Sequence, residues 1–251
     1  MKIIRLERSS YALILVMLGI FLTGIWYADH YYERINTSED PRVVRAKQLY
    51  QNYNQLAVEK KYHEIFELLD SVALIYAQFN DYKQSYELGV VHNNRAALWL
   101  NMALYDLAEG LERDSVVLLA KDETLLGINR YEEWMATFGS YGEEDFDRYL
   151  KSVYQKAFPQ LDSETRSKYV QKRKQEMLMA QEEMSRRLSV SYTNLGVANR
   201  YFGDLEKAVH HYQMAMELWE ENLTAENNIN VLLGRPLKER SLLHRLFPPE
   251  K

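Results

Sequence analysis

The residue types that most often carry catalysis or bind metals are few and scattered in this sequence. It has six histidines and no cysteine, which excludes thiolate nucleophiles, cysteine-ligated zinc and iron–sulfur clusters. His210 and His211 are adjacent and would point about 100° apart on a helix, so they do not form a chelating pair. Glu206 and His210 have the i, i+4 spacing of helical metal ligands. A surface pair is the favoured interpretation, and a metal enzyme or hydrolase that uses these two residues is the alternative.

No phosphate-binding loop, nucleophile elbow or zinc-protease motif is present. His63 and His92 lie far apart in the sequence, without a ligand pattern around them. The acidic run at residues 143–147 is typical of a helix N-terminus, where carboxylates suit the helix dipole, and an acidic docking patch is the alternative. The sequence therefore predicts no catalytic residue, no metal, no cofactor and no small-molecule substrate.

The charge of the chain argues against a dedicated nucleic-acid binder. There are 31 Lys and Arg residues against 36 Asp and Glu, a net charge of −5, whereas nucleic-acid-binding domains are normally basic. Two local basic stretches leave alternatives open. Residues 166–187 carry seven Lys and Arg residues beside three glutamates, which indicates either a solvated helix face or a site for an acidic partner. Residues 237–247 read as a basic amphipathic helix that caps the fold or docks on lipid or a partner.

One segment has the length and composition of a membrane anchor. Residues 9–28 carry no charge, and at the helical rise they would span about 30 Å, the thickness of the hydrocarbon core. Tyr11 at one end and Trp26 at the other would lie at the membrane interfaces. A cleaved signal peptide fits less well because no small-x-small site follows the apolar run. Basic residues before the segment predict a cytoplasmic N-terminus, and a bacterial inner-membrane protein with a periplasmic C-terminal domain.

The remainder of the chain has the apolar periodicity of helices. No strand-like alternation is evident, so we expect an all-α fold of antiparallel helical hairpins. Expected helices are 41–59, 62–78, 82–93, 95–109, 112–121, 124–138, 143–157, 163–202, 204–220, 223–233 and 237–247.

Residues 189–222 resemble a tetratricopeptide repeat over the full length of about 34 residues. The matching positions are Tyr192, Leu195, Gly196, Ala208, Tyr212 and Ala215, with a Gly-Asp turn between the two helices. The resemblance implies that the small residues let two helices approach closely while the large residues pack beside them. Weaker copies lie upstream, as at Trp99 to Ala103, and cannot be kept in one register.

The resemblance also implies a groove for a protein partner. With Trp99, Tyr192 and Glu226 at the fourth position of a first helix, Asn101, Asn194 and Asn228 occupy the sixth position, which usually faces the concave groove in this family. An Asn amide can donate to and accept from the backbone of an extended peptide. Ordinary exposed polar residues are the alternative. The basic residues that clamp a C-terminal carboxylate in some family members are not matched, since Thr193 and Val197 stand at two of those places.

Five regions follow from these patterns. Residues 1–35 form a cytoplasmic tail and transmembrane signal anchor, 36–41 a linker, 42–121 degenerate repeat-like hairpins, 122–162 a helical insertion, and 163–251 a long helix, the repeat and capping helices. We expect a membrane-anchored scaffold or adaptor in a membrane-associated protein complex. A periplasmic chaperone-like holder of exported polypeptides is the alternative. Asn36 and Asn222 satisfy the glycosylation sequon, which would matter only in a eukaryotic secretory pathway.

Overall fold

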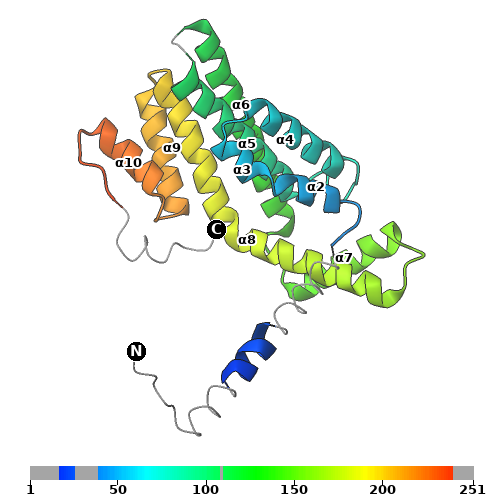
Figure 1. Cartoon of the computed structure of the whole chain (residues 1–251). Coiled ribbons are helices and arrows are strands. Elements are labelled where there is room, and N and C mark those ends of the chain that lie inside the picture. The colour runs from blue at the N-terminus through cyan, green and yellow to red at the C-terminus, as the bar shows by residue number, and fades with distance from the viewer. Residues whose placement is uncertain (1–16, 26–38, 108–109, 240–251) are drawn as a thin grey trace, which may run out of the picture.

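A computed structural model describes residues 17–25, 39–107 and 110–239 of the chain (Figure 1). All regular structure in these ranges is helical, so the predicted all-α class is confirmed. After the helical residues 17–25, the elements are α2 (Val44–Tyr50), α3 (Tyr53–Val58), α4 (Tyr62–Ala77), α5 (Tyr86–Asn101), the π-helical turn η1 (Met102–Asp106), α6 (Leu111–Phe138), α7 (Glu143–Ala157), α8 (Ser163–Tyr201), α9 (Leu205–Leu218) and α10 (Leu223–Leu232).

The long helix α8 connects the two ends of the molecule. Figure 1 shows α7 beside its first half, and α9 and α10 beside its second half. Asp162 caps its N-terminus, since the carboxylate accepts a 2.8 Å hydrogen bond from the Thr165 amide, and Gly203 ends the run with a positive φ of 78°. The predicted helix at 163–202 is confirmed to within a residue. These local signals, a capping acid and a left-handed glycine, explain why it was predictable.

Two predicted interruptions are wrong, because α5 continues through residue 94 and α6 continues through residues 122–123. Asn93 and Asn94 lie at the first of these positions, and Asn side chains can compete with a helix for backbone hydrogen bonds. In the structure their side chains bind other helices instead: Asn94 donates to the Tyr50 hydroxyl at 2.6 Å, and Asn93 accepts from Ser191 at 2.9 Å. Because α6 runs from Leu111 to Phe138, the predicted region boundary between residues 121 and 122 falls inside one continuous helix.

The predicted helix at 41–59 is instead two short helices, α2 and α3. The chain turns at Gln51 and Asn52, where the Asn52 amide donates to the Leu49 carbonyl three residues back. Tyr50 and Tyr53 stack across this turn with their ring centroids 5.5 Å apart. This turn places Tyr50 beside α5.

Two helical hairpins, α5 with α6 and α8 with α9, share one packing device. Gly196 of α8 lies against the ring of Tyr212, where a Cβ atom would come within 2.5 Å of Cε1. Gly89 of α5 meets Tyr131 of α6 at the same distance. Ala208 and Ala215 are fully buried beside Tyr212. The small residues therefore bring each pair of helices together at a glycine and a tyrosine.

The other residues of the predicted repeat lie near this contact. Leu195 is buried, and Tyr192 stacks on the His211 ring with centroids 6.1 Å apart. Trp99, predicted to begin an equivalent helix, instead packs on Phe66 of α4 with centroids 4.2 Å apart. The upstream equivalent of the Gly196 contact is therefore at Gly89, near the start of α5.

The predicted membrane segment at 9–28 lies mostly outside the described residues. Its described part, residues 17–25, is helical and exposes apolar side chains such as Ile20 and Phe21. Among the described helices, none combines the length and apolar character needed to cross a membrane. The amphipathic helix expected at 237–247 is also largely outside the described ranges.

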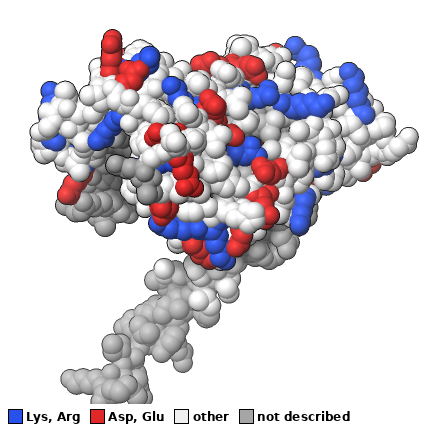
Figure 2. All heavy atoms as spheres, turned by 90° about the horizontal axis from the view of Figure 1, so that it is seen from above, with Lys and Arg blue, Asp and Glu red and all other residues white. Residues whose placement is uncertain are grey.

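The surface in Figure 2 carries acidic and basic side chains side by side. Exposed ion pairs within single helices of the described chain include Lys151 with Asp147 and Lys168 with Glu164. Such exposed pairs are worth little to stability. The face shown in Figure 2 therefore has no extended region of positive or negative charge alone.

Candidate functional site

A groove of about 720 Å³ lies between α2, α4, α5, α6 and α8. Large rings from several of these helices line it, and the turn after α9 adds one more. The aromatic lining residues are Tyr50, Tyr76, Tyr86, Tyr131 and Trp219. Val90 and Val190 add aliphatic surface. Tyr, Trp and Arg are the residue types that dominate binding energy at protein interfaces, so this lining suits a protein ligand.

A buried ion pair lies beside the groove, which its acidic member, Glu87, lines. Arg173 of α8 is only 5% exposed, and its guanidinium binds the Glu87 carboxylate of α5, with Nη2 3.3 Å from Oε2. It also lies over the Tyr82 ring at 4.6 Å. Burial alone would raise the pKa of Glu87, but the charge and hydrogen bonds of Arg173 hold that pKa below its usual range. The pair therefore stays ionised and fixes α5 to α8.

Lys47 brings α2 into the same charged set. Its ammonium binds both Glu39 and Glu176, and Glu176 in turn accepts from Arg173 at 3.3 Å. Burial lowers the pKa of Lys47, but the two carboxylates more than offset this and raise it. The cations at this end of the groove are thus matched by carboxylates of the chain itself.

The other end of the groove is charged differently. Arg186 and Arg187 both pair with Glu183, at 3.5 Å and 2.8 Å. The Arg186 guanidinium lies 6.0 Å from the Trp219 ring centre, and that of Arg187 lies 5.6 Å from the Tyr86 ring centre. Two guanidinium groups therefore share one carboxylate, each beside an aromatic ring that lines the groove.

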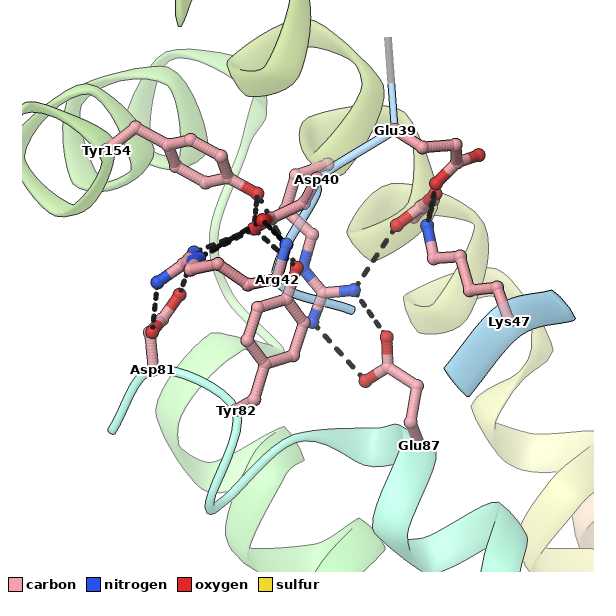
Figure 3. Close-up of polar contacts among 10 residues, drawn as sticks. Glu39, Asp40, Arg42, Lys47, Asp81, Tyr82, Glu87 and Tyr154 are labelled. Atoms are coloured by element: carbon pink, nitrogen blue, oxygen red, sulfur yellow. Dashed lines mark hydrogen bonds and ion pairs between the residues drawn. The ribbon is translucent and has the colours of Figure 1, made fainter. Parts of the chain in front are cut away.

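A second polar cluster holds the segment before α2 against the rest of the fold (Figure 3). The Asp40 carboxylate is buried and accepts hydrogen bonds from Tyr154 at 2.8 Å and Tyr82 at 3.2 Å. Arg42 pairs with Asp40 at 2.7 Å and with Asp81 at 2.8 Å. Burial raises the pKa of Asp40, but Arg42 outweighs it and the pKa is lowered.

Four aromatic rings surround the Arg42 guanidinium at 5.1 to 5.5 Å from their centres. They are Phe79, Tyr82, Tyr154 and Phe158. A guanidinium over ring faces gains cation–π attraction. Through this cage and these ion pairs, Arg42 holds the start of α2, one wall of the groove, to the turn between α4 and α5 and to α7.

The three asparagines predicted to line a groove are not brought together by a shared contact. Asn194 lies near the groove, where its amide donates to Asn93 at 3.2 Å. Asn228 accepts from Arg200 at 3.2 Å. Asn101 is exposed at the far end of α5. If α5 and α8 are aligned at Gly89 and Gly196, the residue of α5 that corresponds to Asn194 is Glu87 rather than Asn101. Glu87 and Asn194 each lie two residues before the glycine. Whether the three asparagines bind a peptide stays a prediction.

The histidines are engaged singly. His211 is held by Asn199, with Nδ1 2.8 Å from Nδ2, and burial, followed by the charge of His210, lowers the pKa of His211. His92 lies 2.7 Å from Glu123. In the part of the chain that the structure describes, no group of three or more His, Cys, Asp or Glu residues could hold a metal ion.

Asn222, the asparagine of a predicted glycosylation sequon, is a buried structural residue. Its Oδ1 accepts from the Ala225 amide at 3.0 Å and so caps α10. Its Nδ2 donates to Ser189 at 2.7 Å and Thr193 at 2.9 Å. A glycan on Nδ2 would displace these contacts with α8. Asn36 lies outside the described residues.

Sequence reasoning missed most of the groove. Arg186 and Arg187 belong to the predicted basic stretch, for which an acidic partner was one of two alternatives, and this alternative stays a prediction. The solvated-face interpretation is wrong for Arg173, which is buried. The aromatic lining on α2, α5 and α6 carried a weak signal, the high tyrosine content of 19 residues, but spacing alone does not assign those rings to one cavity. Comparison of the chain with protein-family models, curated proteins and solved structures gives no match.

Proposed function

We propose that this chain is a membrane-anchored, tetratricopeptide-like scaffold or adaptor that holds a segment of a partner protein in the groove between α2, α5, α6 and α8. The observation that carries the proposal is the composition of the groove, whose rings and arginines are those of protein-binding hot spots. Its walls come from helices that buried ion pairs hold in place, such as Arg173 with Glu87. A preformed groove lowers the ordering cost of binding.

Two further features support the architecture. Residues 189–222 resemble the repeat pattern, and the glycine–tyrosine packing at Gly196 recurs at Gly89. The uncharged segment at 9–28, with basic residues before it, would confine the domain to a membrane surface on the periplasmic side. Confinement at a membrane raises the effective concentration of a partner that lies in the same membrane.

The test is affinity purification of the tagged full chain from native membranes in mild detergent. Val190→Trp fills the groove with a large ring, and Val231→Trp, on exposed α10 outside the groove, is the matched control. We expect one stoichiometric partner that the wild type and Val231→Trp retain and that Val190→Trp loses. A photo-crosslinking residue in place of the groove residue Asn94 should label the same partner, while one in place of Leu118 should not.

Other outcomes separate the alternatives. Many substoichiometric exported proteins that all depend on the groove would favour the chaperone-like holder. A partner that Val190→Trp retains would contradict the groove as its binding site. A reporter fused after Lys251 that proved cytoplasmic would contradict the topology. The predicted contact of Asn194 and Asn228 with a peptide backbone is tested by Asn194→Ala with Asn228→Ala. This double variant should weaken binding of the same partner.

A further inference from the structure

The distribution of charge along the groove defines what it can bind. At the end formed by α2, three cations are matched by three carboxylates. The cations are Lys47, Lys172 and Arg173, and the carboxylates are Glu39, Glu87 and Glu176. That end has its charges neutralised within the chain. Paired groups of this kind do not gain from a further charged ligand unless an existing pair breaks.

At the end near Trp219, the balance is different. The carboxylate of Glu183 is the ion-pair partner that the described residues supply to both Arg186 and Arg187. The Arg186 pair is long at 3.5 Å. Moreover, the Nε atom of Arg187 is buried and has no hydrogen-bond partner. One carboxylate therefore leaves a net positive charge of about one unit here, in a partly enclosed site where it is screened less than at an open surface.

The surroundings of these arginines fit a carboxylate better than a bare anion. Each guanidinium lies beside an aromatic ring, Trp219 for Arg186 and Tyr86 for Arg187. A guanidinium that lies beside a ring face can still donate from its edge to a carboxylate. Aliphatic surface at Val90 and Val190 continues along the groove from this point. The site thus offers charge at one end and apolar contact beside it.

We infer that the groove takes an extended segment of a partner protein that carries an aspartate or glutamate next to apolar residues, with Arg186 and Arg187 receiving the carboxylate. This inference rests on the proposed function, since it names the chemistry of the segment that the groove would hold. It makes Glu183 an internal competitor, because that carboxylate occupies the same two guanidinium groups until a ligand carboxylate joins them.

The test uses the purified full chain in detergent micelles and random 12-residue peptides displayed on phage. Peptides selected on the wild type should be enriched in Asp and Glu beside apolar residues. Selection on Arg186→Gln/Arg187→Gln should lose the acidic enrichment and keep the apolar one, and Arg186→Glu/Arg187→Glu should select basic residues. Arg130→Gln/Arg148→Gln, two arginines outside the groove, is the matched control and should select the wild-type pattern.

A synthetic copy of the most enriched peptide, with a fluorescent label, then gives affinities. Replacing its acidic residue by the matching amide should weaken binding about tenfold or more, the usual loss for a charge-assisted hydrogen bond. Glu183→Gln should strengthen binding of the acidic peptide by up to about fivefold, because it removes the competing carboxylate. A gain in affinity cannot come from a misfolded variant. Arg186→Gln alone, at the more exposed arginine, serves if the double variant is unstable.

Different results would contradict the groove as a binding site and the acidic preference of its ligand. Peptides that bind in the groove, as judged by their loss in Val190→Trp, but show no acidic preference would overturn this inference and leave the groove function standing. Binding that Val190→Trp does not affect would overturn the groove itself. Equal affinities of the wild type and Glu183→Gln for the acidic peptide would contradict the competition by Glu183.

Discussion

The ring of Tyr131 occupies the space that a side chain at Gly89 would need, since a Cβ atom there would lie 2.5 Å from Cε1 and 2.6 Å from Cδ1 of the ring. Contacts this short do not occur between real side chains. Gly89 and Tyr131 thus set how closely α5 approaches α6. Because Tyr131 also lines the groove, the same contact fixes one of the groove walls.

Replacing Gly89 by alanine should destabilise the fold. The added methyl group collides with a ring that is itself buried, so either the ring or a helix has to move. Overpacking of this kind costs about 1–3 kcal/mol, partly offset by up to about 1 kcal/mol from the better helix propensity of alanine. Urea unfolding monitored by circular dichroism should show a lower midpoint.

A double-mutant cycle isolates this contact. Tyr131→Leu removes the ring and should itself be destabilising by leaving space. If the two residues collide as described, Gly89→Ala with Tyr131→Leu should be less destabilised than the sum of the two single variants by about 1 kcal/mol or more. Additive effects would show that the methyl group is accommodated elsewhere.

The sequence predicted those elements whose limits are set locally. Helices α7, α8 and α9 begin after Gly142, Asp162 and Asp204, where a side chain or a turn satisfies the first amides, as in the 3.2 Å bond from the Lys207 amide to Asp204. These signals lie within a few residues of the helix end. The all-α class followed in the same way from periodicity within each segment.

The groove and the first hairpin depended on contacts between distant residues. Gly196 and Tyr212 lie within one repeat length, so their pattern was visible, whereas Gly89 and Tyr131 are separated by the whole of η1 and by the additional turns of α6. The alignment on Trp99 therefore did not locate the contact of Gly89 with Tyr131. In the same way, the residues near Arg173 in the sequence do not indicate that this side chain will be buried and paired with Glu87.

Acid should weaken the contribution of Asp40. Burial would raise its pKa, but Arg42 and the Tyr154 hydroxyl outweigh this effect, and the pKa is lowered in the folded protein. A carboxyl with a lowered folded pKa stabilises the fold above its unfolded pKa of about 4, and that stabilisation is lost as the pH falls through the folded value. Asp40→Asn should cost about 3 kcal/mol at neutral pH, since it leaves Arg42 with one carboxylate fewer in a buried site.

The measurement is the free energy of unfolding of both proteins between pH 7 and pH 3. The difference between wild type and Asp40→Asn should begin to shrink below about pH 4, where the carboxyl of the unfolded chain takes up a proton. It should shrink further as the pH falls through the lower pKa of the folded protein, where the wild-type carboxyl comes to resemble the amide. The exposed Asp70→Asn is the control and should stay within about 0.5 kcal/mol of wild type. A difference that is constant over this range would assign the effect to shape rather than charge.

The buried pair of Arg173 and Glu87 should depend on both partners. Arg173→Met leaves a carboxylate buried between α5 and α8 without its main cation, at a cost of about 3–5 kcal/mol. Arg173→Met with Glu87→Gln removes the uncompensated charge and should recover much of that loss. Thermal unfolding of the two variants distinguishes them, with the exposed Arg148→Met as a control of the same residue type. Equal stabilities of the single and double variants would show that Glu87 is not the group that needs Arg173.

Asn222 should behave as a structural cap rather than a surface residue. Its side chain is 3% exposed and joins the start of α10 to Ser189 and Thr193 of α8. Asn222→Ala removes the N-cap and the hydrogen bonds that the Asn222 amide donates to two buried hydroxyls, for a combined loss of about 2–3 kcal/mol. Asn129→Ala, at an exposed position in α6, should change stability by less than about 0.5 kcal/mol.

Hydrogen exchange should locate the effect of Asn222→Ala, because the amides of α10 lose protection first if the cap is what holds this helix on α8. Uniform loss of protection over α8, α9 and α10 would instead show that the three helices unfold as one unit.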